Sequence, residues 1–346
     1  SDGENEVHFI GDHFLPYDKK IKLKITNLKE KINLSLDLEK NKLEIDSLER
    51  ELTLLHAKVI DLVIEKYEIK KSKIKLVGFH GHTIFHSFKE RKTKQIGDGR
   101  LLSQLTKLNI VNNFRENDIN NGGQGAPLVP IFHKLLQIKL KLKTPLLFVN
   151  IGGISNITYL GQNEEITSLD TGPGNFLIDK ILRLKSKNKI NFDKDGAIAF
   201  TGNVDKNILD SFLNDPYYEI SSPKSLDVND FNLSPLRSLS LEDAVATLAD
   251  LTSLVIVNSL NFFNTKPNEI ILCGGGRKNK YIFERIKTLS GILTNNIDEY
   301  NLNGDFVESQ AFGYLAIRSF FKKSISFPKT TGVSKPCTGG DIIESK

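Results

Sequence analysis

The chain has 346 residues, of which 39% are hydrophobic and 26% are charged, as in an ordinary soluble globular protein. At roughly 150 residues per domain, this length predicts about two domains, each with a sizeable core. The formal net charge is +5, but the basic residues are mostly lysines spread along the chain. Solvated helix faces explain basic runs such as EKYEIKKSKIKL, so we expect neither a nucleic-acid partner nor a membrane partner.

Cysteine usage and apolar runs exclude several other classes. Cys273 and Cys337 are the two cysteines, and their spacing suits neither a disulfide framework nor a zinc site, which favours a reducing cytoplasm. The longest apolar stretch, LTSLVIVNSLNFF, is shorter than the roughly 18 residues that a membrane span needs. We therefore expect no membrane span.

The first part of the chain begins with a strand pattern and continues with helices. Residues 6–14, EVHFIGDHF, alternate as a strand does, and a turn at Ser1-Asp2-Gly3 precedes them. From Lys19 to about Lys70 the apolar residues recur at helical spacing. A short buried strand then breaks at Gly78 in KIKLVGFHGHTIFH. RLLSQLTKLNIVNNF predicts a helix and a strand, and PLVPIFHKLLQIKL predicts another helix.

The second part alternates strands, glycine loops and helices. TPLLFVNIGGISNITYL predicts two strands joined at Gly-Gly, and SLDTGPGNFLIDKIL predicts a loop leading into a helix. The pattern from Leu241 to Phe263 predicts a long amphipathic helix. The stretch PNEIILCGGGRKNKYIFERI predicts a strand, a glycine loop and a helix that begins at about Lys278. This alternation is typical of an α/β protein, in which ligands bind at the carboxyl ends of strands. A break near Lys143 to Pro145 marks the candidate domain boundary.

Three of these loops are candidate ligand loops. The tip Gly152-Gly153 has amides that could face an anion, although a plain hairpin turn explains it equally well. CGGGRKN lets a ring or phosphate lie against bare backbone before a helix, but it lacks the Lys-Ser/Thr pair of a P-loop. Asp170, in LDTGPGN, could reach a hydrated Mg²⁺ or could form a turn that caps the following helix.

Polar residues in the first half and near the last helix form a second set of candidates. His80, His82 and His86 lie close in sequence, and hydrogen bonding to a polar ligand is favoured over a metal site. Glu308 opens the last helix, where the helix dipole also favours a carboxylate, so a sugar contact and a structural role compete. The stretch NNFRENDINNGGQGAPLVP places Arg115 and Asp118 beside a glycine cluster.

Taken in order, a series of motifs from Gly78 to Gly340 resembles that of the anhydro-N-acetylmuramic acid kinases. The motifs are GFHGHTIFH, QIGDGRLL, FRENDINNGGQGAPLVPIFH, NIGGISNIT, LDTGPGNFLID, FDKDGAIAFTG, DPYYEISSPKSLDVNDFNL, LCGGGRKN, VESQAFGYLAIR and FPKTTGVSKPCTGG. The resemblance implies a two-domain actin-like ATPase (ribonuclease H-like) fold of the actin, Hsp70 and sugar kinase superfamily. Each domain would hold a mixed β-sheet flanked by helices. It implies a sugar-binding domain at residues 1–145, a nucleotide-binding domain at 146–309, and a C-terminal helix and tail at 310–346 that return to the first domain.

The family opens 1,6-anhydro-N-acetylmuramic acid with water and transfers the γ-phosphoryl group of ATP to O6, in peptidoglycan recycling. The resemblance therefore implies ATP and Mg²⁺ as cofactors, a cytoplasmic location and a homodimer. The family also carries a phosphate hairpin of the form Gly-x-Met-Ser-Gly-Thr-Ser-x-Asp-Gly, which is not found here. We interpret Ser1 to Gly3 as the turn between the first two strands. Another sugar or acid kinase of the superfamily and a non-catalytic nucleotide-binding relative are the alternatives.

The resemblance and the residue chemistry together give each candidate a role. Asp118 is the predicted base that takes a proton from the attacking water, and Arg115 the predicted neighbouring cation. The predicted sugar-binding residues are His80, His82, Thr83, Gly122, Gly123 and Glu308. The predicted nucleotide-binding residues are Gly152, Gly153, Asn156, Gly172, Gly174, Gly274, Gly275, Gly276 and Asn279. Asp170 is the predicted Mg²⁺ ligand.

Overall fold

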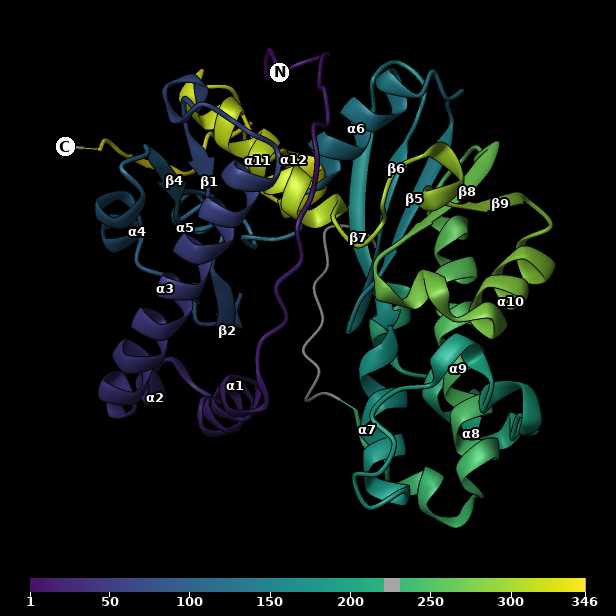
Figure 1. Ribbon diagram of the computed structural model, residues 1–346. Helices are drawn as coiled ribbons and strands as arrows, with labels where there is room; N and C mark the ends of the chain where they lie inside the picture. The colour runs from purple at the N-terminus through teal and green to yellow at the C-terminus, as the bar shows by residue number, and fades with distance from the viewer. Residues whose placement is uncertain (221–230, 346) are drawn as a thin grey trace. The chain divides into compact units, whose positions relative to one another are not determined.

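The structure is a computed structural model that describes residues 1–220 and 231–345 (Figure 1). The chain divides into two compact units: unit 1 comprises Ser1–Leu135 and Glu308–Lys346, and unit 2 comprises Leu136–Val307. The divisions predicted from the sequence lie at 145/146 and 309/310. Residues 221–230, in the middle of the motif DPYYEISSPKSLDVNDFNL, lie outside the described residues.

Unit 1 contains a small mixed sheet, a hairpin and several helices. The sheet has the order β1-β4-β10, with β1 parallel and β10 antiparallel to β4, while β2 pairs with β3 alone as an antiparallel hairpin. The strands are β1 (Val77–Gly78), β2 (His82–Ser87), β3 (Lys92–Ile96), β4 (Ile110–Asn112) and β10 (Asp341–Ile343). The helices are α1 (Lys19–Lys31), α2 (Ser35–Lys40), α3 (Lys42–Lys66), α4 (Gly99–Thr106), α5 (Glu116–Asn120), α11 (Val307–Phe320) and α12 (Pro328–Thr331), with α6 (Pro130–Lys139) running across the division.

The predicted strand at residues 6–14 is wrong, because the structure assigns no strand to this segment. Burial alternates only over residues 6–10, with Val7 and Phe9 half-buried and Ile10 74% exposed. Alternation of side chains does not by itself make a strand, and none of the described strands includes these residues. The preceding turn does form, since Asp2 Oδ1 accepts from the amides of Glu4, Asn5 and Glu6.

The predicted helical region from Lys19 to Lys70 is confirmed, but as three helices. Asp18 caps α1 by accepting from the Ile21 amide at 2.8 Å, and α1 ends at Lys31. The apolar stripes of α1 and α3 bury leucines such as Leu28, Leu48 and Leu52 against the β2–β3 hairpin. This burial holds the hairpin in place in unit 1.

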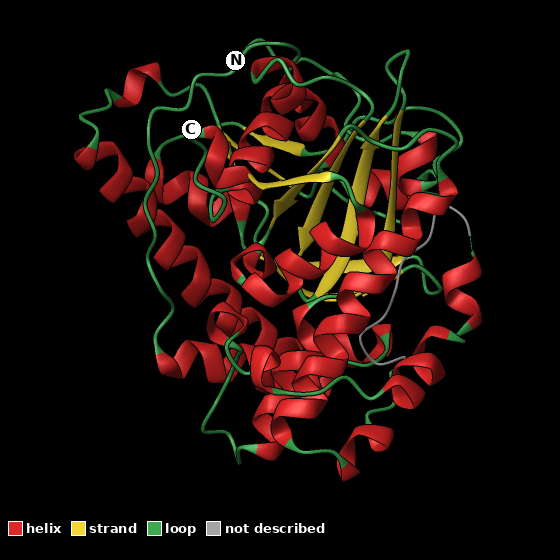
Figure 2. Ribbon diagram, turned by 90° about the vertical axis from the view of Figure 1, so that its right-hand side faces the viewer, coloured by secondary structure: helices red, strands yellow, loops and turns green. Residues whose placement is uncertain are grey.

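Unit 2 is built on a five-stranded sheet of the order β7-β6-β5-β8-β9. Figure 2 shows strands in yellow and helices in red. Its strands are β5 (Leu146–Ile151), β6 (Ile154–Leu160), β7 (Ile166–Pro173), β8 (Glu269–Cys273) and β9 (Leu293–Asn296), and its helices are α7 (Asn175–Lys185), α8 (Lys206–Leu213), α9 (Leu241–Asn258) and α10 (Lys280–Ser290). The first three strands form an antiparallel meander, while β8 and β9 add to β5 in parallel. This is the ribonuclease H-like strand order, so the predicted α/β class and mixed sheets are confirmed.

The helix α9 lies in the core of unit 2. It continues through a 3-10 turn to Phe262. By length and composition alone, the helix Leu241–Phe262 is long enough and apolar enough to cross a membrane. Its most apolar window is 72% buried inside the protein. The predicted helix is confirmed, but it is not amphipathic as predicted. It is buried on almost every side and packs against α7, α8 and α10. Burial of this kind is typical of a core helix.

Candidate functional site

In unit 1, His80 and Arg115 start a chain of hydrogen bonds. His80 lies between β1 and β2, where its Nδ1 contacts the Gly81 carbonyl at 3.0 Å and its Nε2 lies 3.0 Å from Arg115 Nε. Because the guanidinium only donates, Nε2 must accept and the imidazole proton must sit on Nδ1. The ring also stacks on Phe312, with 4.0 Å between centroids. Burial, and then the Arg115 charge, lower the pKa of His80 to about 3, so the ring is neutral.

The series of hydrogen bonds continues through the backbone carbonyl and the backbone amide of Gly125. Arg115 Nη1 donates to the Gly125 carbonyl at 2.8 Å, and the Gly125 amide donates to Asp118 Oδ1 at 2.6 Å. The other carboxylate oxygen of Asp118 accepts from Thr331 Oγ1 at 2.6 Å. Residues from the motifs GFHGHT, FREND, GGQGAP and TTG are thus joined by one unbroken path. We call this path from His80 to Thr331 the unit 1 network.

Asp118 does not lie in the glycine loop itself. It sits on the short helix α5, is 1% exposed, and both of its oxygens already accept hydrogen bonds. A Cβ at Gly123 would come within 2.2 Å of Asp118 Oδ1, whereas one at Gly122 would meet nothing within 4 Å. Gly123 is therefore required by the close approach of the carboxylate, while Gly122 leaves open space. Burial lowers the pKa of Arg115, although the charges of Glu308 and Asp118 oppose this.

The structure separates the predicted sugar-binding histidines. Gly81, with a φ of +74°, breaks the chain between His80 and β2, so His80 and His82 belong to different elements. His82 and Thr83 lie on the β2–β3 hairpin, where Thr83 Oγ1 accepts from Gln95 Nε2 at 3.3 Å. Burial, and then Lys29 and His56, lower the pKa of His82 to about 4. No metal-binding group of three His, Cys, Asp or Glu side chains occurs within residues 1–220 and 231–345.

In unit 2, the predicted hairpin at Gly152-Gly153 is confirmed, and its carbonyls cap a helix. The amides of Gly174 and Phe176 donate to the Gly153 carbonyl, and the Asn175 amide donates to the Gly152 carbonyl at 2.8 Å. These bonds occupy amides at the start of α7 that could otherwise bind phosphate. Gly153 itself is exposed, and its own amide makes no hydrogen bond within the described part of the chain.

The predicted turn at LDTGPGN is instead the end of a strand, because β7 continues to Pro173. A Cβ at Gly172 would come within 2.7 Å of Val255, and one at Gly174 within 2.4 Å of the Gly152 carbonyl. Both glycines are thus explained by close packing inside unit 2. Asp170, half-buried on β7, also accepts a hydrogen bond from Tyr217 at its backbone carbonyl.

A polar row crosses three strands of this sheet. Asp170 on β7 is the cross-strand partner of Asn156 on β6, and Asn156 is the partner of Asn150 on β5. Directly opposed residues point to the same face of a sheet, and all three are half-buried. The row ends beside the glycine loop CGGGRKN, because a Cβ at Gly274 would lie 2.5 Å from Asn150 Oδ1. Carboxylate and amide oxygens are ligands that suit Mg²⁺.

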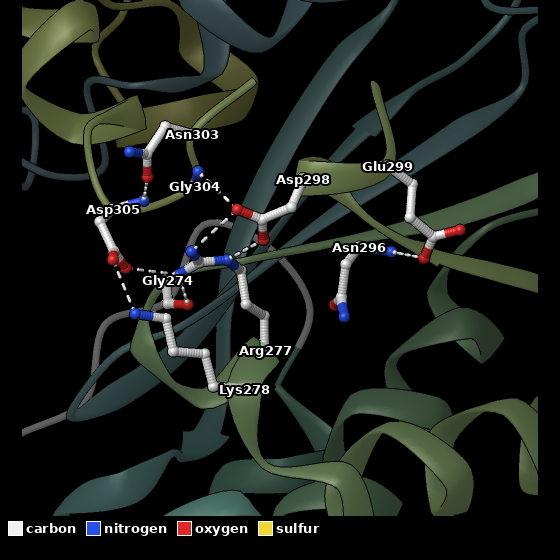
Figure 3. A network of polar contacts seen from close by, with 9 residues as sticks. All are labelled: Gly274, Arg277, Lys278, Asn296, Asp298, Glu299, Asn303, Gly304 and Asp305. Atoms are coloured by element: carbon white, nitrogen blue, oxygen red, sulfur yellow. Dashed lines mark hydrogen bonds and ion pairs between the residues drawn. The ribbon is translucent and has the colours of Figure 1, made fainter. Parts of the chain in front are cut away.

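The glycine loop CGGGRKN is held by Arg277 (Figure 3). Arg277, 3% exposed, donates to both oxygens of Asp298 at 2.5 and 3.1 Å, to Asp305 at 2.9 Å, and to the Gly274 carbonyl at 2.9 Å. These bonds join the loop to the segment between β9 and α11. We call them the unit 2 network. Gly274 has a φ of +75°, a conformation that glycine adopts readily.

The helix after this loop starts later than predicted. Residues Gly275–Lys278 form a 3-10 turn, and α10 begins at Lys280 with Asn279 as its N-cap, accepting from the Ile282 amide at 3.2 Å. A Cβ at Gly276 would come within 2.2 Å of Ile151, whereas one at Gly275 would meet nothing within 4 Å. Gly275 is therefore the exposed, open position of this loop.

Comparison with known proteins agrees with the motif series. The sequence pattern of the family "Anhydro-N-acetylmuramic acid kinase" matches residues 2–345. The chain belongs to this family. It is 46% identical to the anhydro-N-acetylmuramic acid kinase of Pelagibacter ubique (strain HTCC1062) over 100% of this chain and 93% of that protein. It is 40% identical to the one of Zymomonas mobilis subsp. mobilis over 84% of this chain and 79% of that protein. A xylulose kinase structure from Lactobacillus acidophilus aligns with 75% of this chain and over 51% of its own chain, at 12% identity and a TM-score of 0.36.

For this anhydro-N-acetylmuramic acid kinase relative, sequence reasoning missed four residues that organise the loops. Gly125 and Thr331 belong to the unit 1 network, Arg277 centres the unit 2 network, and Asn150 completes the polar row. Each stood inside a quoted motif or next to one, so the signal was present. Only their contacts with distant residues distinguish them from ordinary loop residues.

Proposed function

We propose that this protein is an ATP-dependent kinase that opens 1,6-anhydro-N-acetylmuramic acid with water and phosphorylates O6, giving N-acetylmuramic acid 6-phosphate. Family membership supports the reaction class. The observation that carries the proposal at the level of the site is the unit 1 network, which joins the motifs predicted to bind the sugar. The same reaction would place the protein in the recycling of peptidoglycan.

The reaction needs fewer acid and base groups than ordinary glycoside hydrolysis. A glycosidase uses two carboxyl groups, one to protonate the leaving oxygen and one to activate water or attack carbon. Here the leaving oxygen, O6, is captured by the γ-phosphorus of ATP instead of by a proton. One carboxylate base is therefore sufficient, and the proton from water is the only one that must be removed.

We assign this base role to Asp118, with Arg115 as the neighbouring cation. A carboxylate has about four lone-pair positions, and the bonds from Gly125 and Thr331 occupy two of them. The remaining positions would accept the proton of the attacking water. Gly122, which has open space around its Cα, would let the sugar ring approach the loop. His80, His82, Thr83, Gly123 and Glu308 stay candidate contacts of the sugar.

For the nucleotide, the two open glycines support the proposal best. Gly153 and Gly275 are exposed and have room for a ligand, so they would contact phosphate and adenosine, respectively. Mg²⁺ would be held by Asp170, with Asn156 and Asn150 beside it and the phosphates completing its shell. When bound, Mg²⁺ neutralises charge on the transferring phosphoryl group. Gly152, Gly172, Gly174, Gly274, Gly276 and Asn279 would shape these loops.

A substrate panel tests the proposed function. ADP release by the full-length protein is followed with 1,6-anhydro-N-acetylmuramic acid, N-acetylmuramic acid, N-acetylglucosamine and glucose. We expect turnover with the anhydro-sugar alone, with one phosphate on O6 of the product as seen by NMR. Preferential phosphorylation of a plain hexose would show another sugar kinase, and nucleotide binding without turnover of any sugar would show a non-catalytic relative.

We also propose a cytoplasmic homodimer. Both cysteines are free and buried, which suits a reducing compartment, whereas the dimer follows from the family resemblance. Light scattering of the purified protein tests the dimer, because a mass near 39 kDa, the mass of one chain of 38.8 kDa, would show a monomer. Cell fractionation tests the location.

A further inference from the structure

We propose that Thr331, in α12 near the C-terminus, is a positioning residue of the sugar site. This inference rests on the proposed function, in which the loop of residues 122–125 and Asp118 face the sugar. It assigns a role in that site to a residue that lies 213 positions from Asp118 in the sequence.

The first observation is that Thr331 contacts the loop through both its side chain and its backbone. Its Oγ1 donates to Asp118 Oδ2 at 2.6 Å, and its carbonyl accepts from the Gln124 amide at 2.7 Å. Thr331 is fully buried. A hydroxyl that donates to a buried carboxylate makes a charge-assisted hydrogen bond, which is stronger and more directional than a neutral one.

The second observation is that residues after Thr331 contact both this loop and the helix α5. A Cβ at Gly123 would come within 2.6 Å of Val333 as well as 2.2 Å of Asp118 Oδ1, so Gly123 is enclosed by both. Asn117 Nδ2 also donates to the Thr338 carbonyl at 2.6 Å. The loop thus has little freedom to shift without breaking contacts to residues 331–338.

The third observation concerns the orientation of Asp118. With Oδ1 bound by Gly125 and Oδ2 bound by Thr331, the carboxylate plane is defined by two donors from different parts of the chain. A base works well only when its orientation is held by further groups. Without the Thr331 hydroxyl, Oδ2 would lack this donor, and the carboxylate and the loop would gain freedom to rotate.

The neighbouring residue provides a matched control. Thr330 is also buried, at 2% exposed, and lies on the same helix α12. Its hydroxyl donates to the Phe327 carbonyl and accepts from the Phe327 amide, both within its own turn. Thr330→Val and Thr331→Val therefore remove the same group from adjacent buried positions, but only the second removes a bond to Asp118.

The experiment compares Thr331→Val, Thr331→Ser and Thr330→Val in the full-length protein. We expect Thr331→Val to lower kcat/KM for the anhydro-sugar on the order of ten- to a hundredfold, the size expected for one buried hydrogen bond to a charged group. The KM for ATP should stay within about twofold, because the nucleotide loops lie in unit 2. Thr331→Ser, which keeps the hydroxyl, should restore most of the loss, and Thr330→Val should keep kcat/KM near the original value.

A second measurement needs no substrate. Hydrogen exchange of the amides at residues 119–126 should speed up in Thr331→Val and stay unchanged in Thr331→Ser and Thr330→Val. Turnover and loop exchange in Thr331→Val equal to those of the unaltered protein would overturn the inference, as would equal losses in Thr330→Val. If Thr331→Val does not fold, Thr331→Ala against Thr331→Ser makes the same comparison. Failure of the proposed function would be recognised separately, as an unaltered protein that turns over no anhydro-sugar.

Discussion

Arg115 and Asp118 hold the two ends of one glycine residue: Arg115 donates to the Gly125 carbonyl, and Asp118 accepts from the Gly125 amide. Gly125 has a φ of +74°, which lies in the left-handed region that glycine adopts readily. A cation and an anion therefore both bind the backbone of a residue in this conformation. Unit 2 repeats half of this arrangement, because Arg277 donates to the carbonyl of Gly274, whose φ is +75°. In each unit, an arginine from one of the motifs fixes the shape of a glycine loop.

Asp118→Asn tests the base role. Asn can still accept from the Gly125 amide, and the Thr331 hydroxyl can turn to accept from its Nδ2, so we expect sugar binding to be kept. Turnover should fall by roughly 10²- to 10⁴-fold, the usual loss when a general base is removed. Calorimetry with the anhydro-sugar and steady-state ADP release measure the two effects. Asp61→Asn, on an exposed position of α3, is the control, and near-normal turnover in Asp118→Asn would leave Asp118 with a structural role alone.

His80→Gln tests the neutral histidine in the unit 1 network. The pKa of His80 is about 3 in the folded protein, against about 6.5 when unfolded. Well above pH 6.5 neither state is protonated at this residue, so its full contribution to stability is present there. Between pH 6.5 and 3 only the unfolded state binds the proton, and stability falls by about 1.4 kcal/mol per pH unit for this group.

His56, His82 and His133 also have lowered pKa values and add to the same slope. His80→Gln keeps an acceptor for Arg115 but removes one titrating group. We therefore expect the variant to lose about 2 kcal/mol less than the unaltered protein between pH 6.5 and pH 5. Urea unfolding at the two pH values measures this, and identical slopes in both proteins would show that His80 is not held neutral.

Gly123→Ala and Gly122→Ala form a pair that tests the closeness of the loop to Asp118. The new methyl group at 123 would overlap Asp118 Oδ1 and Val333, which should cost about 1–3 kcal/mol of stability and displace the carboxylate. At 122 the methyl meets open space, and only the φ of +86° opposes it, at about 1 kcal/mol. We expect Gly123→Ala to lose sugar turnover and Gly122→Ala to keep the native loop. The order of their melting temperatures checks this, and a reversed order would contradict the described loop geometry.

Arg277→Lys tests the unit 2 network. The Arg277 guanidinium binds Asp298 through two nitrogens and the Gly274 carbonyl through the third. The single amino group of a lysine cannot make these bonds together. We expect the KM for ATP to rise roughly tenfold, in line with the loss of one charge-assisted bond, with the KM for the sugar unchanged. Lys278→Met removes only an exposed pair with Asp305 and should change neither value. Equal KM values for ATP in Arg277→Lys and the unaltered protein would separate this network from nucleotide binding.

The sequence by itself determined the local parts of this protein. Strand and helix periods, the Gly-Gly turn at Gly152 and the proline at the start of α6 depend on residues close together in the chain, and so does the order of the motifs. That local information was enough to indicate the α/β class and the family. The strand expected at residues 6–14 was wrong, because alternation of side chains does not by itself determine that a segment forms a strand.

Only the tertiary structure decided which residues of the motifs act together. The bond between Thr331 and Asp118 spans 213 residues, and no local pattern encodes a contact at that distance. The same holds for the glycines, since the free space around a Cα depends on what packs against it. Gly123, Gly174 and Gly276 are filled by neighbours, whereas Gly153 and Gly275 stay open, and in the sequence all five look alike.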